Sequence, residues 1–124
     1  MTYIEVLGIV TAVIGKELVA ASSRPMLLSV LAEGESYGYQ IIQNVRELSG
    51  GQIKWSEGML YPVLHRLERE GLINSEWKTS ETGRDRKYYY LSSKGRKALD
   101  SERQQWLMVH NSLCALWKLK PLSA

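Results

Sequence analysis

The sequence contains one cysteine, Cys114, among its 124 residues. A single thiol excludes a disulfide framework within the chain, and it also excludes a cysteine-rich metal site. The scarcity of cysteine fits a reducing compartment, so a cytoplasmic location is expected. Cys114 itself is expected to be a small buried hydrophobic residue rather than a reactive thiol.

Histidine is almost as scarce, since only His65 and His110 are present. They fall on two different expected helices and make no catalytic pair. No acid–base dyad, phosphate-binding loop or metal-ligand spacing accompanies them. The sequence therefore predicts that the protein is not an enzyme and carries no cofactor. A smaller alternative stays open, a metal-responsive regulator, because His110 and Cys114 lie one helical turn apart.

The N-terminal region lacks a run of apolar residues long enough to cross a bilayer. The apolar stretch from Val6 to Ile14 is too short for that, and Glu5 and Lys16 bracket it. No basic side chain precedes the stretch, as a signal peptide would require. We therefore expect no membrane partner. The segment from Tyr3 to Val19 has three interpretations: an amphipathic helix, an extension packed on the body, or a partly disordered leader.

The remaining composition is that of an ordinary globular protein, with 44% hydrophobic and 23% charged residues. A chain of this size suggests one compact domain of modest stability, to which a partner subunit would add buried apolar surface. The net charge of +3 is a weak indication of a polyanionic partner.

Three short stretches with helical spacing of apolar residues follow one another after the N-terminal region. Each is expected to begin near a serine and to end at a glycine, which are common helix start and stop signals. The expected pairs of signals are Ser22-Ser23-Arg24-Pro25 with Gly34, Ser36 with Gly50-Gly51, and Ser56 with Gly71.

The pattern then changes to that of a β-hairpin. Leu72 to Lys78 and Arg86 to Leu91 are expected strands, and a long helix capped by Ser92 or Ser93 runs to about Trp117. The predicted fold is mainly α with a small β-hairpin, a winged helix-turn-helix plus a long C-terminal dimerisation helix. The expected parts are a helical extension at 1–22, the winged helix-turn-helix domain at 23–91, and the dimerisation helix at 92–120.

The third helix, Ser56 to Glu70, is the expected recognition helix, because the second helix of a helix-turn-helix enters the major groove. Its apolar face is Leu60, Val63, Leu64 and Leu67, and its helix start offers free N–H groups to a phosphate. The opposite face is expected to hold Gly58, Tyr61, Pro62, His65 and Arg69. The expected DNA-binding residues of this region are Lys54, Ser56, Gly58, Tyr61 and His65.

The hairpin loop supplies a second expected contact with DNA. A wing of this kind reaches the adjacent minor groove or the backbone, and basic side chains suit both. Glu81 and Asp85 dilute the charge, so a solvated charged loop is the alternative interpretation. The expected DNA contacts of the wing are Arg84, Arg86 and Lys87, with Lys78 opposite them.

The long last helix has no partner in a domain this small. Leu99, Trp106 and Leu113 recur every seventh residue, with Val109 and Leu116 between them, which favours pairing with a second copy. A second stripe is expected to pack on the chain's own body or on the N-terminal helix; it consists of Leu107, Cys114 and Trp117.

Three motifs in this sequence resemble the PadR family of transcriptional regulators, and the resemblance covers roughly Glu17 to Ala98. Met59 stands where that family usually has threonine. The motifs are Tyr37-Gly38-Tyr39-Gln40-Ile41 at the second helix, Gly58-Met59-Leu60-Tyr61-Pro62 with Leu64-His65-Arg66-Leu67-Glu68 and Glu70-Gly71-Leu72-Ile73 at the third, and Gly83-Arg84-Asp85-Arg86-Lys87-Tyr88-Tyr89 with Leu91-Ser92 and Gly95 at the wing.

The resemblance implies a ligand-responsive regulator, usually a repressor, that binds double-stranded DNA at a pseudo-palindromic operator as a homodimer. It adds Tyr37, Tyr39 and Arg66 to the expected DNA-binding residues. The alternative function is a winged-helix module that binds a ligand or a protein without specific DNA binding.

The resemblance also implies the short subfamily with one C-terminal helix, whose multidrug-sensing members stack flat aromatic compounds between two tryptophans across the dimer. Trp106, eleven residues after Gly95, is similar to that tryptophan. Two interpretations of Trp106 stay open, an aromatic effector site and simple dimer packing. The expected effector and dimer residues are Leu99, Trp106, Val109, Leu113 and Trp117.

Overall fold

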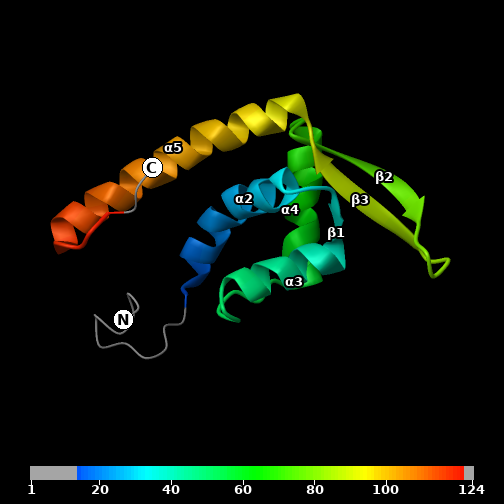
Figure 1. The fold of residues 1–124 in the computed structure, drawn as a ribbon, viewed down its shortest axis with the longest axis horizontal. Coiled ribbons are helices and arrows are strands. Elements are labelled where there is room, and N and C mark those ends of the chain that lie inside the picture. Colours follow the sequence, from blue (N-terminus) through cyan, green and yellow to red (C-terminus); the bar gives the residue numbers. More distant parts are fainter. Residues whose placement is uncertain (1–13, 122–124) are drawn as a thin grey trace.

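The computed structural model describes residues 14–121, so most of the predicted N-terminal extension lies outside the described residues. The described chain is mainly helical and carries a small antiparallel sheet, as predicted (Figure 1). Its elements are α2 (Lys16–Ala32), β1 (Ser36–Tyr37), α3 (Gly38–Leu48), α4 (Glu57–Arg69), β2 (Ile73–Thr79), β3 (Asp85–Leu91) and α5 (Ser93–Trp117).

Helix α2 begins at Lys16, and the helix start predicted at residues 22–25 is wrong, because Pro25 lies inside the helix. Proline cannot donate to the carbonyl four residues back, which costs helix stability. Leu27 and Leu28 follow it and are fully buried, so packing beyond the proline outweighs that loss. The domain boundary expected between residues 22 and 23 therefore falls inside a continuous helix.

The sheet has three strands in the order β1-β3-β2, one more than the predicted hairpin. Ser36 does not cap α3 as expected, because it belongs to β1 and pairs with Tyr89 of β3. Its hydroxyl donates to the Gln40 side-chain oxygen at 2.9 Å instead of accepting from the backbone of the helix. The short strand β1 thus ties the start of α3 to the hairpin.

The starts predicted for the other two helices are confirmed. The Ser56 hydroxyl accepts from the Met59 N–H at 3.2 Å and so caps α4. The Ser92 hydroxyl accepts from the Gly95 N–H at 3.0 Å and so caps α5. Each cap satisfies a backbone donor that the first turn of a helix leaves without a partner.

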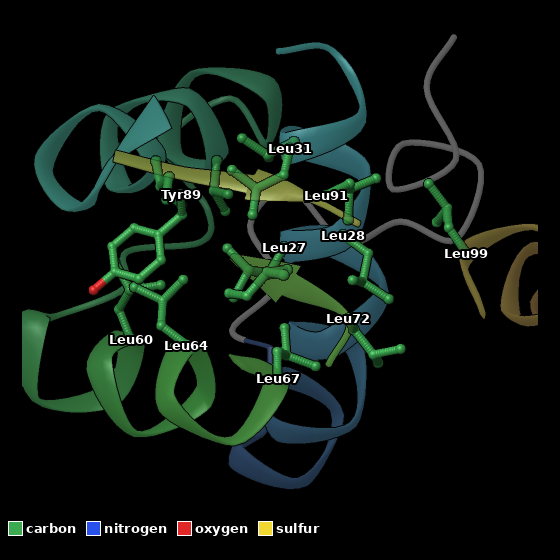
Figure 2. Close-up of a cluster of buried hydrophobic side chains, with 14 of the residues drawn as sticks. Leu27, Leu28, Leu31, Leu60, Leu64, Leu67, Leu72, Tyr89, Leu91 and Leu99 are labelled. Atoms are coloured by element: carbon green, nitrogen blue, oxygen red, sulfur yellow. The ribbon is translucent and has the colours of Figure 1, made fainter. Parts of the chain in front are cut away.

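The hydrophobic core lies between α2, α3, α4 and the sheet. Figure 2 shows the Tyr89 ring of β3 beside Leu60 and Leu64 of α4, with Leu27 of α2 in the same cluster. Among the described residues, Leu99 is the one large apolar side chain of α5 that is buried in this core. Beyond its first turns, α5 extends away from the body (Figure 1).

The start of α5 is fastened to the end of α4. A β-carbon at Gly95 would overlap the Leu72 carbonyl oxygen, so only glycine allows this close approach. The Ser92 hydroxyl donates to the Gly71 carbonyl at 2.6 Å, and the Lys94 ammonium donates to the Glu70 carbonyl at 2.9 Å. The orientation of α5 is therefore linked to that of α4.

Arg24 of α2 adds a second link between these two helices. Its guanidinium lies 2.6 Å from a Glu70 carboxylate oxygen after α4 and 2.5 Å from a Glu102 carboxylate oxygen on α5. Burial acts to lower the pKa of Arg24, but the hydrogen bonds to the two carboxylates outweigh it, so the pKa is raised. Arg24 stays charged and holds three helices at one point.

Candidate nucleic-acid interface

Helices α3 and α4 form the helix-turn-helix, and α4 presents one free face to solvent. Leu60, Leu64 and Leu67 are buried, as the sequence predicts. Lys54 and Ser56 are also exposed at the start of the helix, beside its free backbone N–H groups. The exposed residues of the free face are Gly58, Pro62, His65, Arg66 and Arg69.

Tyr61 does not lie on that free face, so its predicted orientation is wrong. The residue is half-buried and packs against the core. It follows Leu60 by one position, which turns it about 100° from the centre of the buried face and places it on the flank. Gly38 of α3 leaves room for its hydroxyl there. The ring centroids of Tyr61 and His65 lie 6.4 Å apart, so the edge of Tyr61 still borders the free face.

Tyr89 lies beneath α4 and joins it to the hairpin. Burial raises the pKa of Tyr89 to about 12, and the neighbouring Tyr61 and Glu68 add to the shift. The Ser75 hydroxyl of β2 donates to the Glu68 carboxylate of α4, which is a second bond between hairpin and helix. The wing and the expected recognition helix are therefore held as one unit.

Arg86, one of the expected DNA contacts of the wing, packs on an aromatic residue of the sheet. Its guanidinium lies over the Tyr37 ring of β1, 4.2 Å from the centroid. The edge of the Tyr88 ring packs on the same Tyr37, with centroids 5.3 Å apart. The Tyr37 ring therefore contacts Arg86 on one side and Tyr88 on another. Tyr39 is exposed and accepts a hydrogen bond from the Gln43 side-chain amide at 2.9 Å.

The remaining basic residues of the wing differ in their partners. Lys78 lies 2.5 Å from a Glu35 carboxylate oxygen and 3.3 Å from one of Glu76. The hydrogen bond to Glu35 is the main cause that raises the pKa of Lys78. Within residues 14–121, Arg84 and Lys87 make no ion pair. Arg86 makes none in this range either, so all three of these wing cations keep their charge for an external anion.

Helix α5 exposes an apolar face, as predicted for the seam, but Leu99 is not part of it. Leu99 is 4% exposed and belongs to the protomer's own core, because the first turns of α5 lie on the body. Of the expected second stripe, Cys114 is buried and Leu107 is half-buried. The large apolar side chains exposed along α5 are Trp106, Met108, Val109, Leu113, Leu116 and Trp117.

A groove of about 1000 Å³ lies between α2, α3 and α5. Met26 and Val30 line it from α2, Leu48 from α3, and Trp106 and Leu107 from α5. Such a mainly apolar cleft suits an apolar ligand or an apolar side chain from another chain.

Arg103 and His110 of α5 also line this groove. The His110 ring nitrogen Nε2 lies 3.4 Å from the Cys114 sulfur. In residues 14–121, no group of three or more His, Cys, Asp and Glu side chains is placed to hold a metal ion. The pair therefore lacks the further ligands that a metal-responsive site needs in one protomer.

Trp77 of β2 is absent from the predicted site residues, yet it is 69% exposed on the wing. The alternation of side chains along a strand places it on the same face as Ser75 and, across the hairpin, beside Lys87. That alternation is readable in the sequence, but the register with the second strand is needed to pair Trp77 with Lys87.

Comparison with known proteins gives a consistent set of relatives. Residues 27–101 match the sequence profile of the Transcriptional regulator PadR-like family. The transcriptional regulator Rv3488 of Mycobacterium tuberculosis is 38% identical over 89 residues, which are 72% of this chain and 79% of that protein.

Solved structures agree with this result. A PadR-like transcriptional regulator of Bacillus cereus has a TM-score of 0.75 and 28% identity, over 85% of this chain and 100% of that one. A transcriptional regulator of Clostridium thermocellum has a TM-score of 0.72 and 30% identity, over 79% of this chain and 95% of that one. Within the described part of the chain, no helix combines the length and apolarity needed to cross a membrane.

Proposed function

Because the chain belongs to the PadR-like family of transcriptional regulators, we propose that it is a ligand-responsive repressor that binds a pseudo-palindromic operator as a homodimer. The observation that carries this proposal is the free face of α4, where His65, Arg66 and Arg69 are exposed together. A helix exposed in this way within a helix-turn-helix suits the major groove of DNA. Regulators of this family are not enzymes in general, and no catalytic role is proposed.

The wing supports a second contact with the same DNA. Arg84 is exposed and Lys87 is half-buried, and neither makes an ion pair in the described chain, so both can bind phosphates. Phosphate contacts supply most of the affinity of such interfaces. The bond between Ser75 and Glu68 holds the hairpin against α4. The helix and the wing therefore approach DNA as one body and engage it together.

The exposed face of α5 supports the homodimer. Trp106, Val109 and Leu113 lie along one side of the helix and would lose contact with water by pairing with a second copy. A two-fold axis at this seam would present one α4 helix on each side. A spacing of roughly 34 Å between them would match successive major grooves.

The groove beside Trp106 supports a response to a small ligand. A flat apolar aromatic compound would stack on the indole and fill part of the space between α2, α3 and α5. Since Gly95 packs directly on Leu72, a change in the angle of α5 would be passed to the end of α4. Two dimer geometries are then possible, one that fits the operator and one with a different angle of α5. A ligand that binds the second more tightly than the first would weaken operator binding.

A gel-shift experiment with the promoter of the protein's own gene tests this proposal. We expect a discrete complex that unlabelled promoter DNA competes away and that unrelated DNA of equal length does not. Equal competition by both DNAs would contradict specific operator binding. That outcome would instead favour a winged-helix module that binds a ligand or a protein.

A further inference from the structure

The two faces of the wing hairpin have different surroundings, because only one of them packs on α4. Residues directly opposite each other in an antiparallel pair share a face. Ser75 pairs with Tyr89, and two positions toward the tip Trp77 pairs with Lys87, so all four lie on the face that packs on α4. We call this the inner face. The outer face carries Lys78, Arg86, Tyr88 and Tyr90.

Trp77 is exposed although it lies on the inner face. Tyr89, on the same face, is buried against α4, whereas Trp77 is 69% exposed because it lies further toward the tip, where no core covers it. A large aromatic side chain left in water on a thin hairpin loses the stabilisation that burial would bring. Its indole also keeps a free N–H donor at one edge, which suits a surface that is apolar and polar in turn.

The inner face also carries a cation that makes no ion pair in the described chain. On the outer face, Glu35 and Glu76 neutralise Lys78, and Arg86 is stacked on Tyr37. On the inner face Lys87 makes no ion pair in the described chain, and its ammonium lies 5.7 Å from the centroid of the Tyr89 ring.

The acidic residue nearest the tip of the inner face has a partner of its own. Asp85 accepts a hydrogen bond from the Thr79 hydroxyl at 2.8 Å. That hydrogen bond leaves Asp85 charged, so the inner face presents the Lys87 cation next to the flat apolar plate of Trp77, with a carboxylate nearer the tip.

We infer that Trp77 and Lys87 form a clamp on the sugar-phosphate backbone of the DNA that α4 contacts. Lys87 pairs with a phosphate, while the Trp77 indole lies against the adjoining deoxyribose and donates its N–H to a phosphate oxygen. The backbone of DNA alternates anionic phosphates with less polar sugars, which matches this pair of side chains. The inference rests on the proposed DNA-binding function.

The test compares matched substitutions on the two faces of the same hairpin. Trp77→Ala and Lys87→Gln change the inner face, while Tyr90→Ala and Lys78→Gln remove the same kinds of group from the outer face. The full-length protein is titrated with fluorescent promoter DNA at several salt concentrations. Circular dichroism and urea denaturation of every variant give the fold and the stability independently of DNA.

We expect Trp77→Ala to weaken promoter binding about five- to tenfold with little change in salt dependence. Lys87→Gln should weaken binding to all sequences and lower the slope of log affinity against log salt by about one. Trp77→Phe should restore part of the affinity, because the aromatic plate remains. Tyr90→Ala and Lys78→Gln should bind like the parent protein.

Two outcomes separate this inference from the proposed function. If the parent protein binds no promoter DNA specifically, the proposed function fails, and the clamp fails with it. If the parent binds specifically while a folded Trp77→Ala variant binds equally well, the clamp alone is overturned. A molar mass of Trp77→Ala without DNA that differs from that of the parent would also overturn the clamp. The inner face would then form a contact between two copies of the protein instead of a contact with DNA.

Discussion

The Tyr61 hydroxyl of α4 occupies the space that a side chain on Gly38 of α3 would need. A β-carbon added to Gly38 would lie 2.5 Å from that oxygen, a separation that real β-carbons do not show. Residue 38 is also buried, so a larger side chain has no alternative direction into solvent. The approach of the two helices of the helix-turn-helix therefore depends on glycine at this position.

Gly38→Ala should lower the free energy of unfolding by about 1–3 kcal/mol, the usual cost of overpacking. Gly58→Ala is the matched control, because its nearest neighbour, the Ser56 hydroxyl, would lie 3.9 Å away. On the exposed helix it should stabilise by up to about 1 kcal/mol. Adding Tyr61→Phe to Gly38→Ala removes the crowding oxygen and should recover part of the loss. Urea denaturation measures all three, and equal stability of Gly38→Ala and the parent would contradict the tight contact.

His65→Ala should weaken promoter binding by roughly 1–3 kcal/mol without changing stability, because His65 is exposed on the free face of α4. Fluorescence anisotropy gives the affinity, and thermal unfolding gives the stability. Lys97→Ala, on the exposed side of α5, is a control that should leave both unchanged. Loss of affinity in the control as well would mean that overall charge, rather than the position of His65, governs binding.

Leu113→Asp should convert the proposed homodimer to a monomer, because it places a charge in the middle of the apolar face of α5 through which we propose the two copies pair. Met108→Asp is the matched control: Met108 is 69% exposed, against 36% for Leu113, and is turned to another side of the helix. Light scattering coupled to gel filtration distinguishes the two masses. A dimer of unchanged mass in Leu113→Asp would place the interface elsewhere.

Planar aromatic dyes should quench tryptophan fluorescence and weaken promoter binding, because Trp106 lines the groove between α2, α3 and α5. Stacking contributes about 0.5–1.5 kcal/mol beyond burial. Trp106→Ala should abolish the quenching and keep the dimer, and Trp117→Phe should retain the quenching. The sequence holds four tryptophans, so the two variants are needed to assign the signal. If Trp106→Ala binds the dyes with unchanged affinity, the dye site lies elsewhere and Trp106 serves only in packing.

The protein should lose stability above pH 10 partly through Tyr89. Burial raises the pKa of its phenol from 10.0 to about 12 in the folded state, while the unfolded chain keeps the ordinary value. The unfolded state therefore releases the proton first as the pH rises. The contribution of Tyr89 is fully present below pH 10 and is lost as the pH rises toward 12. Urea denaturation across this range should show a shallower decline for Tyr89→Phe than for the parent, and parallel curves would contradict the shift.

Interactions between residues close together in the sequence determine where several of the helices begin and which face of α4 is buried. Ser56 and Ser92 cap α4 and α5 because a hydroxyl reaches the backbone N–H three residues ahead, and no distant group is involved. The buried face of α4 follows from the helical period of Leu60, Leu64 and Leu67 alone. The same period predicts the exposure of His65, so the centre of the candidate interface could be located from the sequence.

Contacts between residues far apart in the sequence determine the continuity of α2 and the surroundings of the basic residues of the wing. Pro25 remains inside α2 because Leu27 and Leu28 are buried on other elements, an energy that local helix signals do not contain. Arg86 and Lys87 are neighbours in the chain, but β1 brings Tyr37 under the guanidinium, whereas the Lys87 ammonium lies on the other face, near the Tyr89 ring. The face on which each basic residue lies, and the aromatic ring that it contacts, thus depend on side-chain alternation along β3 and on a strand from the first half of the chain. Only the tertiary structure brings these together.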